Sequence, residues 1–368
     1  MALLTDIEIM KLALSLAERG RYKTAPNPMV GAVIVKNNKI ISKGYHHKAG
    51  SDHAEIDAFK KAKTSIRNST LYVTLEPCCH TGRTGPCTEA IIKAGIKKVV
   101  IAARDADPRV KGKGINILKK AGIDVKVGLL RKESIKLNEA YFHYNLLHRP
   151  FVILKEAQSI DGRIATVTGD SKWISSPESL KMVHGLRAEA DAVLVGMGTV
   201  QNDNPSLTVR HIKGNDPYRI VLTKSMKFPK NCNLIKHNQD FKTIVASSSD
   251  QIEKYSKKNR NANLIYWNIS ELRNGSLSLD DLLKRAEEFG IRSLLVEGGS
   301  EVATLFLKAK LVDKYIAVIS PKIIGSGINS VNDLNIRKVI DSITFKESEF
   351  IPSGCDCLFI GYPDWSRK

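Results

Sequence analysis

The first 150 residues alternate between helical and strand-like patterns of apolar and polar positions. A helical period runs from Asp6 to Gly20, and further helical patterns begin near His53, Cys87 and Lys113. Strand patterns cover Val30–Lys36, Lys39–Tyr45, Thr70–Leu75, Lys98–Ala103 and Asp124–Val127. Asn37-Asn38, a pair that tolerates positive φ, separates the first two strand patterns and predicts a hairpin. This alternation predicts an α/β sandwich.

A break in the pattern divides the chain near residue 149. A helical pattern from Lys132 to Leu147 meets His148-Arg149-Pro150, after which Phe151–Ala157 has a strand pattern. Proline ends helices and restricts the residue before it to extended conformations. We therefore predict two domains, residues 1–148 and 149–368.

The second part alternates in the same way. Its strand patterns are Ala192–Gly196, Arg219–Leu222, Thr243–Ala246, Ser293–Glu297 and Tyr315–Ile319. Its helical patterns lie near Ser176–Ala188, Leu279–Phe289 and Glu301–Lys308. These elements predict a second α/β domain.

Length and composition agree with two folded domains in a reducing compartment. The chain has 368 residues, 42% of them hydrophobic. It has no uncharged apolar run near the ~20 residues that cross a bilayer, and its first helical pattern is amphipathic, so we expect a cytoplasmic protein without a membrane partner. Six cysteines are too few for a disulfide framework, and the clustering of Cys78, Cys79 and Cys87 favours metal binding or catalysis.

The net charge of +19 raises the alternative of a nucleic-acid partner. The surplus is concentrated at the start of the chain, because the first 150 residues hold 27 basic and 13 acidic residues. Lysines outnumber arginines, whose planar fork suits phosphate better, so solvated surface lysines explain much of the charge. A nucleic-acid partner is not expected, but it stays open for the first domain.

Three residues have the types and positions of a zinc site. His53 opens a helix, Cys78 follows a strand, and Cys87 starts the next helix. One imidazole and two thiolates leave a fourth tetrahedral position for water, which is the catalytic arrangement of zinc. Glu55, two residues past His53, is placed to move a proton between water and a departing amine without binding the metal. Alternatively, these residues cap helices and pack as small hydrophobic groups.

This His-x-Glu and paired Pro-Cys pattern resembles the zinc-dependent cytidine-deaminase superfamily, although here the two ligand cysteines are separated by eight residues. The insertion Cys79–Pro86, with Asn27–Gly31 and Thr74–Cys78, closely resembles the RibD family of bifunctional riboflavin-biosynthesis deaminase/reductases. The resemblance covers nearly the whole chain. It implies hydrolytic deamination of a diaminopyrimidinone that carries a ribosylamino phosphate, followed by reduction of the ribosyl to a ribityl chain with NADPH.

The family resemblance also implies a deaminase substrate pocket lined by Asn27, His46 and Arg83. Asn27 could equally be a turn residue. We interpret Cys79 as a bystander thiol, and the pair Cys355 and Cys357, in an alternating strand pattern, as structural. The implied cofactors are Zn²⁺ and NADPH, and the implied partner is a small phosphorylated pyrimidine. A homo-oligomer stays open.

No Gly-x-Gly-x-x-Gly follows a strand in the second part, so no classical dinucleotide motif is present. Val296–Ser300 instead forms a glycine-containing strand-to-helix turn, where backbone amides can approach a phosphate. Such a turn can also be purely structural. Together with Lys155, Ser159–Arg163, Ser171–Ile174 and Gly196–Val200, it resembles the reductase domain of the family, which is similar to dihydrofolate reductase.

This second resemblance implies the fold and the residues of the reductase site. The N-terminal domain is then a cytidine-deaminase-like α/β/α sandwich, and the C-terminal domain a dihydrofolate-reductase-like α/β fold. The implied cofactor contacts are Ala157, Trp173, Thr199, Asp203, Gly299, Ser300 and Glu301. The implied substrate contacts are Ser171, Arg187, Leu207, Arg210 and Glu297. Lys155 and Glu297 are the candidates for proton supply, although Lys155 could be an ordinary exposed strand lysine.

The chain departs from the family in carrying Glu156 and Gln158 where small residues are usual. We expect these longer side chains to narrow the cofactor slot. Two other functions stay open: a transfer-RNA adenosine deaminase with an appended domain, and a binding protein in which zinc is only structural. The presence of Glu55 argues against the second, because a structural site needs no proton carrier.

Overall fold

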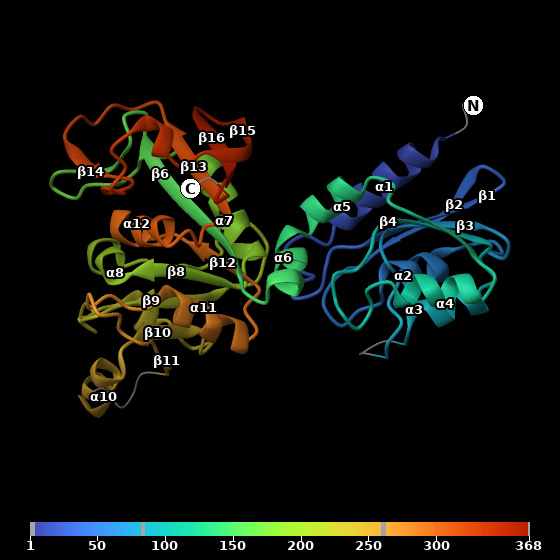
Figure 1. Ribbon diagram of the computed structural model, residues 1–368, viewed down its shortest axis with the longest axis horizontal. Helices are drawn as coiled ribbons and strands as arrows, with labels where there is room; N and C mark the ends of the chain where they lie inside the picture. Colours follow the sequence, from blue (N-terminus) through green and yellow to red (C-terminus); the bar gives the residue numbers. More distant parts are fainter. Residues whose placement is uncertain (1–3, 82–84, 259–262, 367–368) are drawn as a thin grey trace. The chain divides into compact units, whose positions relative to one another are not determined.

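The computed structural model describes residues 4–81, 85–258 and 263–366. It divides into two compact units, residues 1–148 and 149–368 (Figure 1). Within the described residues, no helix is long and apolar enough to cross a membrane.

The first unit is built on a five-stranded sheet in the order β2-β1-β3-β4-β5. Its strands are β1 (Gly31–Lys36), β2 (Lys39–Tyr45), β3 (Thr70–Leu75), β4 (Lys98–Ala103) and β5 (Asp124–Val127). Strands β3, β4 and β5 are parallel, whereas β1 is antiparallel to both of its neighbours. The predicted hairpin forms, and both Asn37 and Asn38 have positive φ.

Helices cover both faces of this sheet. They are α1 (Asp6–Glu18), α2 (Ala54–Lys61), α3 (Cys87–Lys93), α4 (Lys113–Lys120), α5 (Arg131–Leu137) and α6 (Glu139–Leu147). One core packs α2, α3 and α4 against the sheet. A second core packs α1 against the opposite face, with Met10 fully buried. The α/β/α sandwich predicted for this part is confirmed.

Two glycines allow helices to approach the sheet closely. A Cβ on Gly31 would lie 2.0 Å from the carbonyl oxygen of Ala13 in α1. A Cβ on Gly44 would lie 2.4 Å from the carbonyl oxygen of Ala54 in α2. Gly44 therefore fixes how close the first turn of α2, which carries Glu55, lies to the sheet.

The helix predicted from Lys132 to Leu147 is interrupted at Asn138. Asn138 accepts a hydrogen bond from the Met29 amide at 2.8 Å and donates one to the Met29 carbonyl at 2.9 Å. Its φ of −120° is not helical, so α5 and α6 are separate helices. The break anchors the segment Asn27–Gly31 in front of β1.

The second unit contains a nine-stranded sheet in the order β11-β10-β9-β8-β12-β6-β13-β16-β15. Its strands are β6 (Phe151–Ser159), β8 (Ala192–Gly196), β9 (Tyr218–Leu222), β10 (Thr243–Ser247), β11 (Ile265–Asn268), β12 (Ser293–Val296), β13 (Lys314–Ser320), β15 (Phe345–Ser353) and β16 (Asp356–Pro363). From β11 to β13, each strand is parallel to its neighbours in the sheet. Strand β16 is antiparallel to β13, and β15 pairs with β16 as an antiparallel hairpin. A small pair, β7 (Arg163–Thr166) and β14 (Gly327–Asn329), lies apart from it.

Two cores flank the central strands of this sheet. One packs α11 (Leu279–Glu288) and α12 (Ser300–Lys308) on one face. The other packs α7 (Pro177–Glu189), α8 (Met197–Asp203) and α9 (Asn233–Lys236) on the opposite face. Figure 1 shows β6 crossing the unit and α12 beside it. Helix α10 (Ser249–Lys258) and the short turn η1 (Val339–Asp341) complete the described elements.

The patterns predicted the long, buried elements of this unit and missed the short or exposed ones. Helices α8 and α9 have seven and four residues, too few for a helical period to emerge. Strand β15 is exposed along almost its whole length, so its residues carry no alternation of apolar and polar positions.

Candidate functional site

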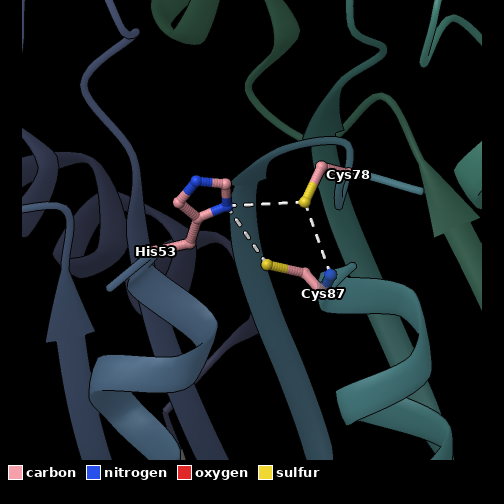
Figure 2. A group of neighbouring side chains, drawn as sticks. All are labelled: His53, Cys78 and Cys87. Atoms are coloured by element: carbon pink, nitrogen blue, oxygen red, sulfur yellow. Dashed lines mark hydrogen bonds between the residues drawn. The ribbon is translucent and has the colours of Figure 1, made fainter. Parts of the chain in front are cut away.

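His53, Cys78 and Cys87 converge from three different segments of the first unit. His53 immediately precedes α2, Cys78 follows β3, and Cys87 is the first residue of α3. Figure 2 shows their side chains pointing towards one another. The ligand atoms all lie within 4.8 Å of one another.

The distances in this cluster fit a tetrahedral zinc ion. The His53 Nδ1 atom lies 3.4 Å from the Cys78 sulfur and 3.3 Å from the Cys87 sulfur. Zn–N and Zn–S bonds of about 2.0 and 2.3 Å at a tetrahedral angle would separate nitrogen from sulfur by about 3.5 Å. An imidazole and two thiolates also have the donor chemistry that zinc prefers. The residues therefore fit the ion.

The protein prepares one of the two thiols for ligation. Hydrogen bonding from Cys87, acting against burial, lowers the pKa of Cys78 to about 4. The backbone amide of Cys87, in the first turn of α3, lies 3.4 Å from the Cys78 sulfur and donates to it. The hydrogen bond of the Cys87 thiol to Cys78 and the burial of Cys87 raise the pKa of that thiol. The protein thus favours one thiolate, and a cation is needed to stabilise the second.

Glu55 lies beside the cluster in the first turn of α2. Its side chain is 3% exposed, and burial together with the Cys78 charge raises its pKa to about 7. A carboxyl group with a pKa near neutrality can both accept and release a proton.

Asn27 and His46 lie next to this centre and contact each other. The Asn27 side-chain amide is 3.2 Å from the His46 Nε2 atom, and the His46 Nδ1 atom is 3.0 Å from the carbonyl oxygen of Asp52. Burial lowers the pKa of His46, which favours the neutral ring. Its ring meets that of His53 edge-on, with centroids 5.4 Å apart. Arg83 lies outside the described residues.

Glu76 supports the ligand loop, a role that the sequence did not reveal. Its buried carboxylate accepts hydrogen bonds from the amides of Asp105, Gly112 and Ile115 at 3.0 to 3.2 Å. The sequence feature that could have indicated this role is an acidic residue directly after a buried strand. Cys79 lies outside the metal cluster, with its sulfur 3.6 Å from the carbonyl oxygen of Arg109.

A charged network occupies the second unit, where β6, α7 and the end of β12 meet. The Arg187 Nε and Nη2 atoms donate to the two carboxylate oxygens of Glu297 at 2.7 and 2.9 Å. The Lys155 Nζ atom lies 3.8 Å from Glu297. Burial opposes the charge of Glu297, but Arg187 and Lys155 lower its pKa to about 2.

The turn between β12 and α12 brings several predicted cofactor residues together. A Cβ on Gly299 would lie 3.7 Å from the Thr199 hydroxyl, so these two residues are adjacent. A Cβ on Gly298 would lie 2.5 Å from the Cβ of Val302. The close packing against Val302 therefore accounts for a glycine at this position. Ser300 and Glu301 form the first turn of α12, whose N-terminus has no side-chain cap.

The remaining predicted reductase residues lie on loops and strands of the same unit. The Ser171 hydroxyl is 3.4 Å from the Asp203 carboxylate. Trp173 is 70% exposed, and the guanidinium-bearing residue Arg210 is also exposed. Ala157 is half-buried on β6. Leu207 is 2% exposed and packs in the α7–α9 core.

Glu156 and Gln158 do not lie on the Lys155 face of the sheet. Side chains alternate along a strand, and Leu154 packs into the α11–α12 core whereas Ile153 packs into the α7–α9 core. Glu156 and Gln158 therefore share the Leu154 face, and Lys155 and Ala157 share the other. The narrowing of the cofactor slot by these two side chains stays a prediction, and strand alternation places them on the face opposite Lys155.

Two family models match the chain. The model described as the RibD C-terminal domain matches residues 150–359. The model described as the cytidine and deoxycytidylate deaminase zinc-binding region matches residues 4–103.

Curated relatives and solved structures match over nearly the full length. The riboflavin biosynthesis protein RibD of Aquifex aeolicus is 44% identical over 354 residues, covering 96% of this chain and 97% of the relative. The Escherichia coli RibD is 36% identical, covering 96% and 99%. The Acinetobacter baumannii RibD structure superposes with a TM-score of 0.88 at 34% identity, covering 98% and 99%. A Thermotoga maritima structure, described as a diaminohydroxyphosphoribosylaminopyrimidine deaminase/5-amino-6-(5-phosphoribosylamino)uracil reductase, has a TM-score of 0.81 at 36% identity, covering 97% and 98%.

Proposed function

Since this chain belongs to the RibD family of riboflavin-biosynthesis proteins, we propose that residues 1–148 perform its deamination and residues 149–368 its reduction. The chain is a diaminohydroxyphosphoribosylaminopyrimidine deaminase and 5-amino-6-(5-phosphoribosylamino)uracil reductase of riboflavin biosynthesis. A transfer-RNA deaminase is not favoured, because the relatives match across both units.

In the deaminase unit, His53, Cys78 and Cys87 would hold a zinc ion. When bound, zinc lowers the pKa of water and makes it a nucleophile at neutral pH. Glu55, with its raised pKa, takes the proton of the attacking water and delivers it to the departing amine, which leaves as ammonia. Asn27 and His46 hold the pyrimidine, and their mutual contact fixes the orientation of both side chains.

In the reductase unit, the α12 N-terminus and the adjacent Thr199 would hold the phosphate groups of NADPH. Ala157, Trp173 and Asp203 would contact the rest of this cofactor, which supplies the hydride. Lys155 is the candidate donor of the accompanying proton. Arg187 is hydrogen-bonded to Glu297, whereas the Lys155 ammonium lies 3.8 Å from the Glu297 carboxylate, beyond hydrogen-bond distance. Ser171 and Arg210 would hold the substrate.

The observation that carries the deaminase assignment is the convergence of His53, Cys78 and Cys87 beside buried Glu55. The test is to incubate the purified protein with the phosphorylated diaminopyrimidine, with and without NADPH. Ammonia release in both mixtures, and NADPH oxidation only after ammonia release, are expected. NADPH oxidation without prior ammonia release would contradict the proposed order.

The edge strand β15 supports a homo-oligomer. It is the last strand of the nine-stranded sheet and exposes Phe350, which is 66% exposed. Unpaired sheet edges with apolar side chains readily pair with another chain. Light scattering of the wild type and of Phe350→Lys tests this: the variant should have the smaller mass.

A further inference from the structure

His184 is a buried histidine that the mechanism above does not use. It lies in α7, three residues before Arg187, so both side chains are on the same side of the helix. The ring is 0% exposed. It faces the segment from Leu207 to His211, and its ring meets that of His211 edge-on, with centroids 4.5 Å apart.

Among the described residues, the ring makes one hydrogen bond, and that bond holds the backbone of Arg210. The Arg210 amide donates to the His184 Nδ1 atom at 3.0 Å. Because Nδ1 accepts this bond, the neutral ring carries its proton on Nε2. The Nε2 atom is buried and has no hydrogen-bond partner within the described part of the chain.

An unpaired buried donor is unfavourable, and an apolar side chain of similar size would avoid it. Packing alone therefore does not explain a histidine here. The feature that a leucine could not supply is the Nδ1 acceptor for Arg210.

The segment around Arg210 is held at three successive residues. The Arg187 Nη1 atom donates to the Thr208 carbonyl at 3.3 Å, and the Val209 amide donates to the Asp216 carboxylate at 2.6 Å. The bond from Arg210 to His184 is the third. The Arg210 guanidinium, in contrast to this fixed backbone, is exposed. Among the described residues, its one hydrogen bond is to the Thr208 hydroxyl, at 3.1 Å.

The surroundings of the His184 ring keep it neutral, so that its Nδ1 atom can accept the hydrogen bond from the Arg210 amide. The charged or titratable groups that face it are Arg187 on its own helix, Arg210 and His211 on the loop, and Glu297 after β12. Burial and the two arginines lower the pKa of His184 to about 4. The ring is therefore neutral at neutral pH.

We propose that His184 is a positioning residue of the reductase, which fixes Arg210 so that its guanidinium meets the phosphate end of the substrate. The proposal rests on the substrate-holding role given to Arg210 above. His184 acts through geometry, because anchoring the phosphate at one end of the substrate positions the C1′ atom of the ribosyl group, at the other end, for hydride transfer.

Two amide replacements separate this role from packing. Asn carries its side-chain oxygen near the position of Nδ1, whereas Gln carries it nearer to Nε2. We expect His184→Asn to keep the KM for the phosphorylated reductase substrate within about twofold of wild type. His184→Gln should raise that KM about fivefold to tenfold. A change of this size corresponds to the loss of roughly one hydrogen bond, here the bond that the Arg210 amide donates. Both should leave the KM for NADPH and the deamination rate unchanged.

A double-mutant cycle shows whether the effect passes through Arg210. Arg210→Ala alone should raise the same KM, and adding His184→Gln to it should raise it no further. If Arg210→Ala raises the KM but His184→Gln does not, or if the two effects add, the positioning role is overturned. If Arg210→Ala has no effect, the substrate role of Arg210 fails, and the positioning role falls with it. Equal losses for His184→Asn and His184→Gln would indicate packing instead.

Discussion

Arg187 holds Glu297 through two parallel hydrogen bonds of 2.7 and 2.9 Å, with side chains only 11% and 8% exposed. Its remaining terminal nitrogen donates to the Thr208 carbonyl. The guanidinium is thus committed to three protein contacts, whereas the exposed guanidinium of Arg210 has one. Both residues were predicted from the family resemblance to hold substrate, and the structure gives them different surroundings.

Arg187→Ala should therefore impair folding as well as reduction. Removing one partner of a buried pair leaves the other charge uncompensated, at a cost of about 3–5 kcal/mol. Arg210→Lys should leave the unfolding midpoint unchanged but impair reduction, because a lysine ammonium lacks the paired donors that suit phosphate. Urea unfolding and NADPH oxidation of both variants check this. Equal unfolding midpoints for the two variants would contradict the difference in their surroundings.

Cys87→Ser should remove most of the zinc from the purified protein. Cys87 contributes one of three converging ligand atoms, whereas Cys79 lies outside the cluster. Cys79→Ser is the matched control and should retain about one zinc per chain, as elemental analysis would measure. If Cys79→Ser loses the metal instead, the ligand assignment is wrong.

Most of the zinc centre could be predicted because its chemistry is local in sequence. His53 and Glu55 are two residues apart, and both cysteines follow proline at the ends of predicted elements. Strand and helix patterns then place these junctions at one end of the sheet. The family resemblance added Asn27 and His46, whose mutual contact no pattern in the sequence indicates.

The contacts that support the sites could not be predicted because they join residues far apart in the chain. Asn138 interrupts a helix through hydrogen bonds to Met29, 109 residues away. Glu297 meets Arg187 across 110 residues. A helical period reports which side of a helix is apolar, but it does not report which distant backbone group a polar side chain will meet.

Glu55→Gln should abolish most of the deamination and leave the metal in place. Glutamine keeps the shape of the side chain but carries no proton, and positioned acid–base groups contribute ~10²–10⁴-fold to rates. The variant should retain zinc and an unchanged rate of reduction of the deaminated intermediate. Glu55→Asp, which keeps the carboxyl group on a shorter chain, should recover part of the ammonia release. Ammonia release near the wild-type rate in Glu55→Gln would exclude the proton-transfer role.

His184 and Glu297 should lose their contributions to the stability of the second unit in two stages as the pH falls. The pKa of His184 is lowered from 6.5 to about 4, so the unfolded chain binds its proton first, and stability is lost as the pH falls from about 6.5 to 4. The pKa of Glu297 is lowered from 4.5 to about 2, so its contribution is lost as the pH falls below about 4.5. His184→Asn should flatten the first stage in urea titrations, whereas His237→Asn, at an exposed residue, should not. An unchanged slope for His184→Asn between pH 6.5 and 4 would contradict the lowered pKa.

Cutting the chain after His148 should give two fragments that fold separately. Arg149 belongs to the second unit, where it donates to both carboxylate oxygens of Asp313 at 2.7 and 2.6 Å, and Asp313 also accepts the Val152 amide. A fragment of residues 149–368 keeps these bonds and should oxidise NADPH with the deaminated intermediate.

The position of the cut is itself a test. A fragment of residues 1–148 keeps α6, including buried Phe142, and the paired bonds between Asn138 and Met29. It should bind zinc and release ammonia. The shorter fragment of residues 1–137 loses Asn138 and Phe142, which together order the segment that carries Asn27, so its deamination should fall sharply even where zinc is retained. Circular dichroism, zinc content and ammonia release of the two fragments would measure this difference. Equal activity of both would show that α6 does not support the deaminase site, and loss of folding in residues 1–148 would show that the two units depend on each other.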